Sequence, residues 1–244
     1  MTAKKRDEVP KMKMFCFCHA GGLAGYYSFL KEANVAGVDE VNLFEYPGRG
    51  RSYGQKGYKN FDECVEDSCK KIAKSGVQSE EFILFGHSMG AFVAYETACK
   101  LQKDYNLYPY HVFVSGQKPP VRVEPSHYAE CEEKVLEFLK RLGGVPEIIL
   151  KNKEMTDFFM DICIKDLRVL QSYVPHEAVT DNLPKRGSVI CGDEDAEVAQ
   201  EELADWKAYF GTEPDIHIVH GNHFYISEKK DELISFMNRE LRRA

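Results

Sequence analysis

A buried-strand pattern that ends at a serine between two glycines constrains this chain more than any other stretch. Residues 82–85 (Phe-Ile-Leu-Phe) predict a strand covered on both faces, because no polar residue alternates with the apolar ones. Gly-His-Ser-Met-Gly follows at 86–90, and residues 89–100 continue as a helix with a face of small residues. This succession is typical of a nucleophilic serine on a strained turn, where flanking glycines avoid clashes around Ser88. A glycine turn with an incidental serine is the alternative, which the flanking strand and helix disfavour.

Strand and helix patterns alternate along most of the 244 residues. The expected strands cover 13–18, 41–46, 82–85, 110–115, 187–192 and 215–219. Helical patterns lie between and after them, and this order predicts a mostly parallel, doubly wound α/β sheet with helices on both faces. Residues 122–182 interrupt the alternation with helical patterns only. The sequence therefore predicts a single domain over 1–244, with a helical lid at 122–182 inserted at the carboxyl edge of the sheet.

A nucleophilic serine needs a base to take its proton, and the base needs an orienting acid. In this architecture the acid and then the histidine follow the serine in the chain, each after the carboxyl end of a strand. The loop after the strand at 187–191 offers Asp193, Glu194 and Asp195. Asp195 is the predicted acid, because three residues past the glycine allow the loop to turn towards the histidine. Asp193 remains the rival, and Glu194 is disfavoured.

The base is sought in the loop after the last expected strand, which offers His220 and His223. His220 still lies at the strand end, where an edge histidine is the ordinary interpretation. His223 follows Gly221 and Asn222, in a loop that is free to fold over Ser88. His223 is therefore the predicted base.

Acyl transfer by a serine also requires two hydrogen-bond donors for the oxyanion. The backbone N–H of Met89 follows from the strand-to-helix turn itself. The second donor should come from the loop after the first strand, where glycines at 21, 22 and 25 let the backbone turn inward. The N–H of Ala20 is the predicted second donor, while His19 and His87 are interpreted as bracing side chains.

Composition and charge disfavour several other classes of protein. The net charge is −7 and no basic stripe is present, which argues against nucleic-acid binding. No apolar run reaches membrane-spanning length and no signal-peptide core is found, so a cytoplasmic location is expected. The eight cysteines show no Cys-x-x-Cys spacing and are interpreted as small buried hydrophobic residues. No metal or other cofactor is expected.

Eight sequence blocks together resemble one family. In chain order they are FCFCHAGG, EYPGRGRS, LFGHSMGAFVAYETA, VSGQKPP, LGGVPEIIL, DLRVLQSY, GDEDAEV and GNHFYI. Their order and spacing are similar to those of type II thioesterases, the stand-alone editing hydrolases of polyketide and non-ribosomal peptide assembly lines. The resemblance runs from about residue 13 to residue 236 and implies an α/β-hydrolase fold.

The resemblance also implies roles for particular residues and a substrate class. It assigns the nucleophile to Ser88, the acid to Asp195, the base to His223 and the oxyanion donors to Ala20 and Met89. The implied reaction is hydrolysis of acyl thioesters on the phosphopantetheine arms of acyl- or peptidyl-carrier proteins, by a monomeric enzyme of antibiotic biosynthesis. Basic residues near the lid, Arg141, Lys151 and Lys153, are a candidate docking patch for the carrier.

Three other functions compete with this interpretation. The nearest is a medium-chain fatty-acyl thioesterase that releases product from a fatty-acid synthase with the same fold and catalytic residues. A carboxylesterase or lipase is disfavoured because the first loop lacks the His-Gly-Gly-Gly arrangement of those enzymes. A non-catalytic binding protein on this fold is disfavoured because all three catalytic positions have candidates.

Overall fold

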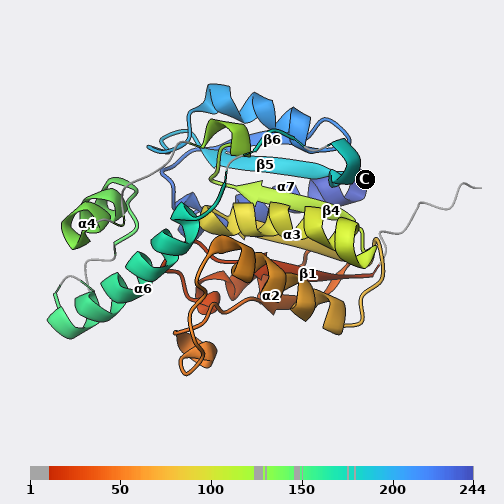
Figure 1. Cartoon of the computed structure of the whole chain (residues 1–244). Helices are drawn as coiled ribbons and strands as arrows, with labels where there is room; N and C mark the ends of the chain where they lie inside the picture. The colour runs from red at the N-terminus through yellow and green to blue at the C-terminus, as the bar shows by residue number, and fades with distance from the viewer. Residues whose placement is uncertain are drawn as a thin grey trace, which may run out of the picture.

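The computed structural model describes residues 11–123, 129, 131–145, 149, 151–174, 176–178 and 180–243. These residues form a six-stranded sheet in the order β2-β1-β3-β4-β5-β6, in which every neighbouring pair is parallel (Figure 1). The strands are β1 (Met12–Phe17), β2 (Val38–Leu43), β3 (Phe82–His87), β4 (His111–Ser115), β5 (Gly187–Gly192) and β6 (Asp215–Val219). The predicted doubly wound parallel sheet is therefore confirmed.

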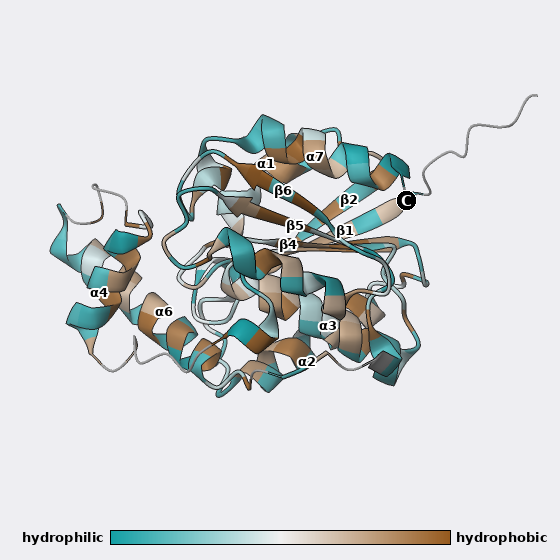
Figure 2. Ribbon diagram, turned by 90° about the horizontal axis from the view of Figure 1, so that it is seen from above, coloured by the Kyte–Doolittle hydropathy of each residue, from teal (hydrophilic) through white to brown (hydrophobic). Residues whose placement is uncertain are grey.

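Helices cover both faces of this sheet. Helices α2 (Phe61–Lys74) and α3 (Met89–Tyr105) lie on one face, and α1 (Phe29–Glu32) and α7 (Lys230–Arg243) on the other (Figure 2). Short 3₁₀ helices occupy several connections: η1 (Ala24–Tyr27), η2 (Gly50–Ser52), η3 (Pro120–Arg122), η5 (Thr180–Asn182) and η7 (Tyr225–Ser227). Since each strand enters the sheet parallel to its neighbours, the loops that follow the strands meet at one edge, where a site can form.

The segment around residues 200–210 differs from its predicted helix. It is a ten-residue 3₁₀ helix, η6 (Gln200–Tyr209), and its buried residues are Leu203, Trp206 and Tyr209. Residues three apart lie on the same side of a 3₁₀ helix, which has three residues per turn. These three buried residues pack on the domain, and Trp206 and Tyr209 both contact Tyr95 of α3. Because they are spaced three apart, this packing favours a 3₁₀ helix over an α-helix.

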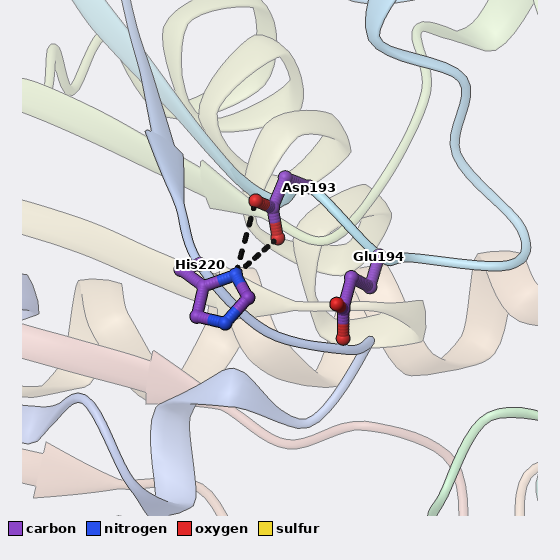
Figure 3. Close-up of side chains that lie close together, drawn as sticks. All are labelled: Asp193, Glu194 and His220. Atoms are coloured by element: carbon purple, nitrogen blue, oxygen red, sulfur yellow. Dashed lines mark hydrogen bonds and ion pairs between the residues drawn. The ribbon is translucent and has the colours of Figure 1, made fainter.

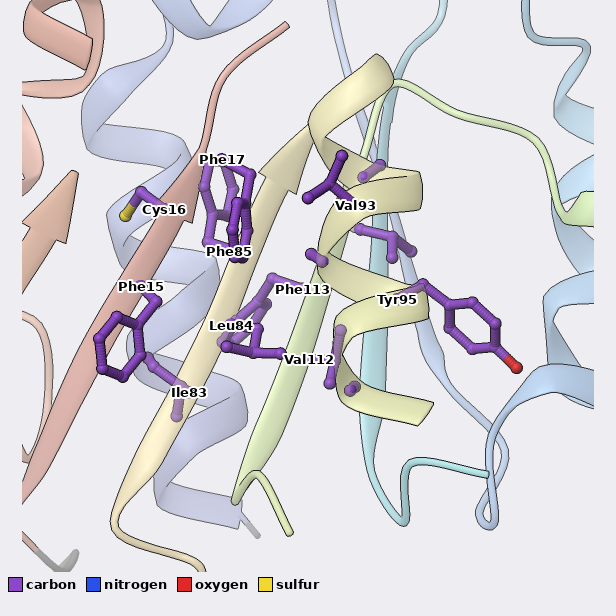
Figure 4. Close-up of a cluster of buried hydrophobic side chains, with 14 of the residues drawn as sticks. Phe15, Cys16, Phe17, Ile83, Leu84, Phe85, Val93, Tyr95, Val112 and Phe113 are labelled. Atoms are coloured by element: carbon purple, nitrogen blue, oxygen red, sulfur yellow. The ribbon is translucent and has the colours of Figure 1, made fainter. Parts of the chain in front are cut away.

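The centre of the core lies where β1, β3 and β4 pack against α3 (Figure 4). All six residues of β3 are buried, as its continuous apolar run predicts. Helix α3 approaches the sheet closely through small residues. A Cβ atom on Gly90 would lie 2.2 Å from the carbonyl oxygen of Phe17, and one on Gly86 would lie 1.8 Å from the carbonyl oxygen of Gly90. The two glycines beside Ser88 are thus required by the close packing of the turn.

Two helices of the interrupting segment, α4 (Glu132–Arg141) and α6 (Lys153–Gln171), lie together at one end of the domain (left in Figure 1). They share a small hydrophobic cluster, separate from the main core, formed by Ala129, Val135, Leu139, Met160, Cys163 and Leu167. The segment's role as a lid and the single-domain boundary at 1–244 stay predictions, because residues 1–10, 244 and parts of 122–182 lie outside the described residues.

Two further expectations concern the surface and the cysteines. Within the described residues, no helix is long and apolar enough to cross a membrane. All eight cysteines are free thiols, and six of them are buried as expected. Cys99 is half-buried, and Cys131 is exposed because it occupies the N-cap position of α4 rather than a helix interior.

Candidate active site

Ser88 occupies the turn between β3 and α3, where the sequence predicted it. Its backbone has φ 55° and ψ −122°, a strained conformation for a residue with a side chain. The Ser88 N–H donates to the carbonyl oxygen of Ser115 at 2.8 Å, and the Ser88 carbonyl accepts from the N–H of Ala91 at 2.9 Å. These bonds to β4 and to the first turn of α3 hold the half-buried side chain at the carboxyl edge of the sheet.

His223 and Asp195 form a buried pair at the same edge. The Nδ1–H of His223 donates to Oδ2 of Asp195 at 2.7 Å, and Oδ1 of Asp195 accepts from the N–H of Glu197 at 2.9 Å. The exposed fraction of the Asp195 side chain is 0% and that of His223 is 3%. A carboxylate can only accept, so this bond places the ring proton on Nδ1 and leaves Nε2 as the basic nitrogen. No described residue bonds to that buried Nε2.

The rival residues Asp193 and His220 pair with each other instead, on the surface (Figure 3). His220 Nδ1 lies 3.1 Å from Oδ2 of Asp193, and the side chain of His220 is 73% exposed. The N–H of Gly221, which donates to Asp193 at 2.9 Å, together with His220 lowers the pKa of that carboxyl. Neither residue lines the cavity that holds Ser88 and His223.

Glu194 completes a group of three exposed side chains with Asp193 and His220, with potential ligand atoms within 4.8 Å of one another. Figure 3 shows the Glu194 carboxylate beside the pair. Within the described residues this is the one group with the spacing of a metal site. Exposed acidic groups commonly gather without a metal, and none of the three residues lines the cavity that holds Ser88.

The two predicted oxyanion donors come from the serine turn and from the loop after β1. Met89 is the first residue of α3, and the N–H groups of a first helical turn lack partners within the helix and carry its positive dipole end. Ala20 lies in the loop after β1 and lines the cavity together with Ser88. Among the described residues, neither N–H has a hydrogen-bond acceptor. Both groups are thus available to a negatively charged oxygen.

His19 and His87 are held in place by hydroxyl groups. Nδ1 of His19 lies 2.8 Å from the hydroxyl of Tyr27, and Nδ1 of His87 lies 2.9 Å from the hydroxyl of Ser115. Burial lowers the pKa of His19 to about 3 and the pKa of His87 well below its ordinary value. The nearby His223 is the second cause of both shifts. The His87 ring lies 5.0 Å from the His223 ring, centroid to centroid. Both histidines are therefore neutral rings packed around the catalytic candidates.

A cavity of about 370 Å³ connects these residues to the helical segment. His19, Ala20, Ser88 and His223 line one part of the cavity, and another part forms an apolar wall. The apolar wall consists of Phe138, Leu139, Leu142, Leu167 and Leu170, from α4, the residue that follows it, and α6. Two other hollows of about 350 and 580 Å³ border α2 and contain none of the predicted catalytic residues. The cavity beside Ser88 is suited to an apolar chain whose reactive end meets polar groups.

Two residues near the site were missed by the sequence analysis. Asp166 of α6 accepts a hydrogen bond from the N–H of Gly21 at 2.8 Å, in the loop that carries Ala20. Arg49 forms a buried, two-pronged ion pair with Asp166. Both residues lie in sequence blocks of the family resemblance, but no spacing rule connects positions 117 residues apart.

Comparisons with known proteins place this geometry in a family. A family model described as a thioesterase domain matches residues 12–241. The gramicidin S biosynthesis protein GrsT of Aneurinibacillus migulanus is 28% identical over 243 residues, which cover 97% of this chain and 91% of that protein. The medium-chain S-acyl fatty acid synthase thioesterase of Anas platyrhynchos is 28% identical, over 93% of this chain and 91% of that protein.

A solved structure agrees over a similar length. RedJ, the thioesterase from the prodiginine biosynthetic pathway of Streptomyces coelicolor, superimposes with a TM-score of 0.82 at 25% identity, covering 98% of this chain and 90% of that chain. This likeness confirms the predicted α/β-hydrolase fold, and the matched family model confirms the resemblance drawn from the motifs. The chain belongs to the thioesterase family and is a hydrolase of thioester bonds.

Proposed function

We propose that this chain is a type II thioesterase that removes acyl groups from the phosphopantetheine arms of carrier proteins and thereby edits stalled or misprimed polyketide and non-ribosomal peptide synthases. The observation that carries the proposal is the buried Asp195–His223 pair, whose histidine lines the same cavity as Ser88, together with the apolar wall of that cavity. Relatives from the gramicidin S and prodiginine pathways support this biosynthetic setting.

The first half of the reaction forms an acyl-enzyme. Ser88 Oγ attacks the thioester carbonyl while Nε2 of His223 takes the hydroxyl proton. Asp195 keeps the ring in the orientation and tautomer that this transfer requires, and it stabilises the positive charge that forms. The N–H groups of Ala20 and Met89 hold the negative oxygen of the tetrahedral intermediate. When the carbon–sulfur bond breaks, the proton passes from His223 to the departing thiol of the carrier.

The second half releases the acid and restores the enzyme. A water molecule gives a proton to Nε2 of His223 and attacks the Ser88 ester, and the same two N–H groups hold the oxyanion again. Collapse of this intermediate returns the proton to Ser88 Oγ and yields the carboxylic acid. The apolar wall of the cavity holds the acyl chain during both halves and keeps bulk water from the ester.

Two residues of the predicted docking patch for the carrier form ion pairs within the chain, which decides which of them is the better one to replace. Arg141 is ion-paired with Glu197, and the backbone N–H of Glu197 donates to Asp195. Lys153 is ion-paired with Asp157 at 2.8 Å. Replacing Arg141 would therefore disturb the loop after β5 that carries Asp195, here called the acid loop, as well as any carrier contact. Lys153→Ala leaves the acid loop intact. The patch stays a prediction, and Lys153→Ala is the cleaner variant.

The proposal is tested by comparing kcat/KM for a propionyl group on a carrier protein with that for the propionyl thioester of N-acetylcysteamine. Binding energy from the remote carrier surface can orient the thioester over Ser88, so the carrier substrate should be favoured by about tenfold or more. Equal values would contradict recognition of a carrier. Ser88→Ala serves as the control for background hydrolysis.

Release of medium-chain products from a fatty-acid synthase is the second candidate, and the relative from Anas platyrhynchos favours it. A series of acyl groups from C2 to C12 on one carrier separates the two functions. An editing enzyme should show its highest kcat/KM with short acyl groups, since misprimed carriers bear such groups. A maximum at C8 to C12 would assign the second function.

A further inference from the structure

A buried ion pair joins three segments that lie far apart in the chain. Asp166 comes from α6, Arg49 from the turn after β2, and the backbone that both contact is the loop after β1. The exposed fractions of the Arg49 and Asp166 side chains are 2% and 8%. One oxygen of Asp166 accepts from Nη1 of Arg49 at 2.6 Å, and the other oxygen accepts from Nη2.

The same groups also bind the loop backbone directly. Oδ2 of Asp166 accepts from the N–H of Gly21 at 2.8 Å, and Nη1 of Arg49 donates to the carbonyl oxygen of Gly22 at 3.1 Å. Burial alone would lower the pKa of Arg49, but the hydrogen bond and charge of Asp166 hold it above its ordinary value. The guanidinium therefore remains charged and ties the carboxylate to the loop.

The loop itself lies directly on α6. Gly21 has φ +79°, and a Cβ atom there would lie 2.3 Å from Sγ of Cys163, which stands one turn before Asp166 on the same helix face. A loop with Gly21 and Gly22 in sequence has many accessible backbone conformations. The contacts with α6 and Arg49 select one of them.

Stability alone does not account for this arrangement. A buried ion pair commonly contributes no more than two apolar residues of the same volume, because both charges must leave water. What the pair adds here is direction, since Asp166 also accepts from the N–H of Gly21 and Arg49 also donates to the carbonyl oxygen of Gly22, in the two residues that follow Ala20. Oxyanion donors act through their fixed orientation before the reaction begins.

We propose that Asp166 and Arg49 are positioning residues that fix the N–H of Ala20 for oxyanion stabilisation. The inference rests on the proposed role of Ala20 as an oxyanion donor. It makes the position of this donor depend on the docking of α6, a helix that contributes to the apolar wall of the cavity. The bond from Gly21 to Asp166 is its central contact, because it holds the peptide group next to the donor.

Two double variants isolate that contact. Arg49→Met with Asp166→Asn removes both charges but keeps an oxygen that can accept from the N–H of Gly21. Arg49→Met with Asp166→Leu removes both charges and the acceptor. Neither leaves a buried unpaired charge, which would itself destabilise the protein strongly. Asp161→Asn, at an exposed ion pair with Lys165 on the same helix, is the control and should behave as the wild type.

The measurements are the melting temperature and the separate kcat and KM values for the propionyl thioester of N-acetylcysteamine. The Asn double variant should keep kcat within about threefold of the wild type. The Leu double variant should lose about 10- to 100-fold in kcat with little change in KM, somewhat less than removal of an oxyanion donor costs elsewhere. Equal kcat values for the two folded double variants would overturn the proposal, and so would a loss confined to KM.

Asp166→Glu provides a variant that keeps the ion pair if a double variant does not fold. Its extra methylene should displace the N–H of Gly21 and lower kcat several-fold, and an unchanged kcat would contradict the proposal. A trifluoromethyl ketone analogue of the substrate, which forms a hemiketal with Ser88, gives a second readout. Loss of the positioned donor should raise the pKa of the hemiketal hydroxyl in carbon NMR, whereas a purely structural role would leave it unchanged.

The choice of substrate separates this inference from the biosynthetic function. N-acetylcysteamine thioesters carry no protein, so the variants report on oxyanion chemistry even if the enzyme shows no preference for carriers. A carrier preference with unaffected double variants would leave the proposed function in place and remove the positioning role.

Discussion

Oδ2 of Asp195 accepts the Nδ1–H of His223 at 2.7 Å, in a pair that is almost completely shielded from solvent. Three positions before the histidine, His220 makes a similar bond to Asp193, but that pair is exposed. The chain thus carries two carboxylate–histidine pairs on the same two loops. Only the buried pair includes a residue that shares a cavity with Ser88.

Asp195→Asn should lower kcat by about 10³- to 10⁴-fold, because an amide in that position also favours the wrong histidine tautomer. Asp193→Asn is the matched control and should remain within about threefold of the wild type, as should His220→Ala. Steady-state kinetics on one thioester substrate, with circular dichroism to verify folding, make the comparison. A larger loss in the Asp193 variant would assign the acid to the surface pair instead.

Helix α4 should open more readily than the central sheet. It packs mainly on α6 through the small hydrophobic cluster, and an ion pair between Arg141 and Glu197 ties it to the acid loop. Hydrogen exchange should show low protection in α4 and high protection in β3, with α6 between them because Asp166 is clamped by Arg49. Glu197→Gln should speed exchange in α4 further. Equal protection of α4 and β3 would count against a lid that opens for substrate.

The segment that follows α6 should carry a pH-dependent contribution to stability. A hydrogen bond from His176 to Glu96, 2.9 Å long, raises the pKa of His176 to about 9. Glu96 also accepts from the hydroxyl of Tyr173, whose ring stacks on Phe92 of α3. The pKa of a histidine in the unfolded chain is about 6.5. Between that pH and about pH 9 the folded protein therefore binds one more proton than the unfolded chain does. The stabilisation is complete below about pH 6.5 and is lost as the pH rises through about 9.

Melting temperatures of the wild type and Glu96→Gln between pH 6 and pH 10 measure this contribution. The difference between the two proteins should be largest near pH 6 and should shrink towards pH 10. Because His176 is about one-third exposed, the pH-dependent part should amount to no more than about 1 kcal/mol. A difference that does not vary with pH would show that Glu96 does not raise the pKa of His176.

Local sequence signals were sufficient for the fold and for the serine turn. A continuous apolar run can be recognised without any knowledge of contacts, and all six residues of β3 are buried as that run predicts. The glycines at 86 and 90 predicted a tight turn. The structure adds that the missing side chain of Gly90 lets α3 approach β1, and that of Gly86 lets the first turn of α3 approach β3. The expected order of acid and base after the serine came from the chain order typical of this architecture, which the alternation of strands and helices indicated.

Features that depend on contacts across the chain could not be predicted in the same way. The N–H of Asp193 bonds to the carbonyl of Val219 and its side chain stays at the surface, while Asp195 turns inward. Adjacent acidic residues in a loop give no sign of this difference. Arg49 lies between two glycines in the sequence, and only folding brings it to Asp166, 117 residues away.

The most direct test of the proposed function is a single-turnover reaction with a propionylated carrier protein, followed by mass spectrometry of both proteins. The wild type should return the carrier with its free phosphopantetheine thiol and transiently gain one propionyl group on the peptide that contains Ser88. Ser88→Ala should leave the carrier acylated and should slow release by about 10³-fold or more. An acylated carrier that persists with the wild type, or that is cleared equally fast by Ser88→Ala, would contradict the account.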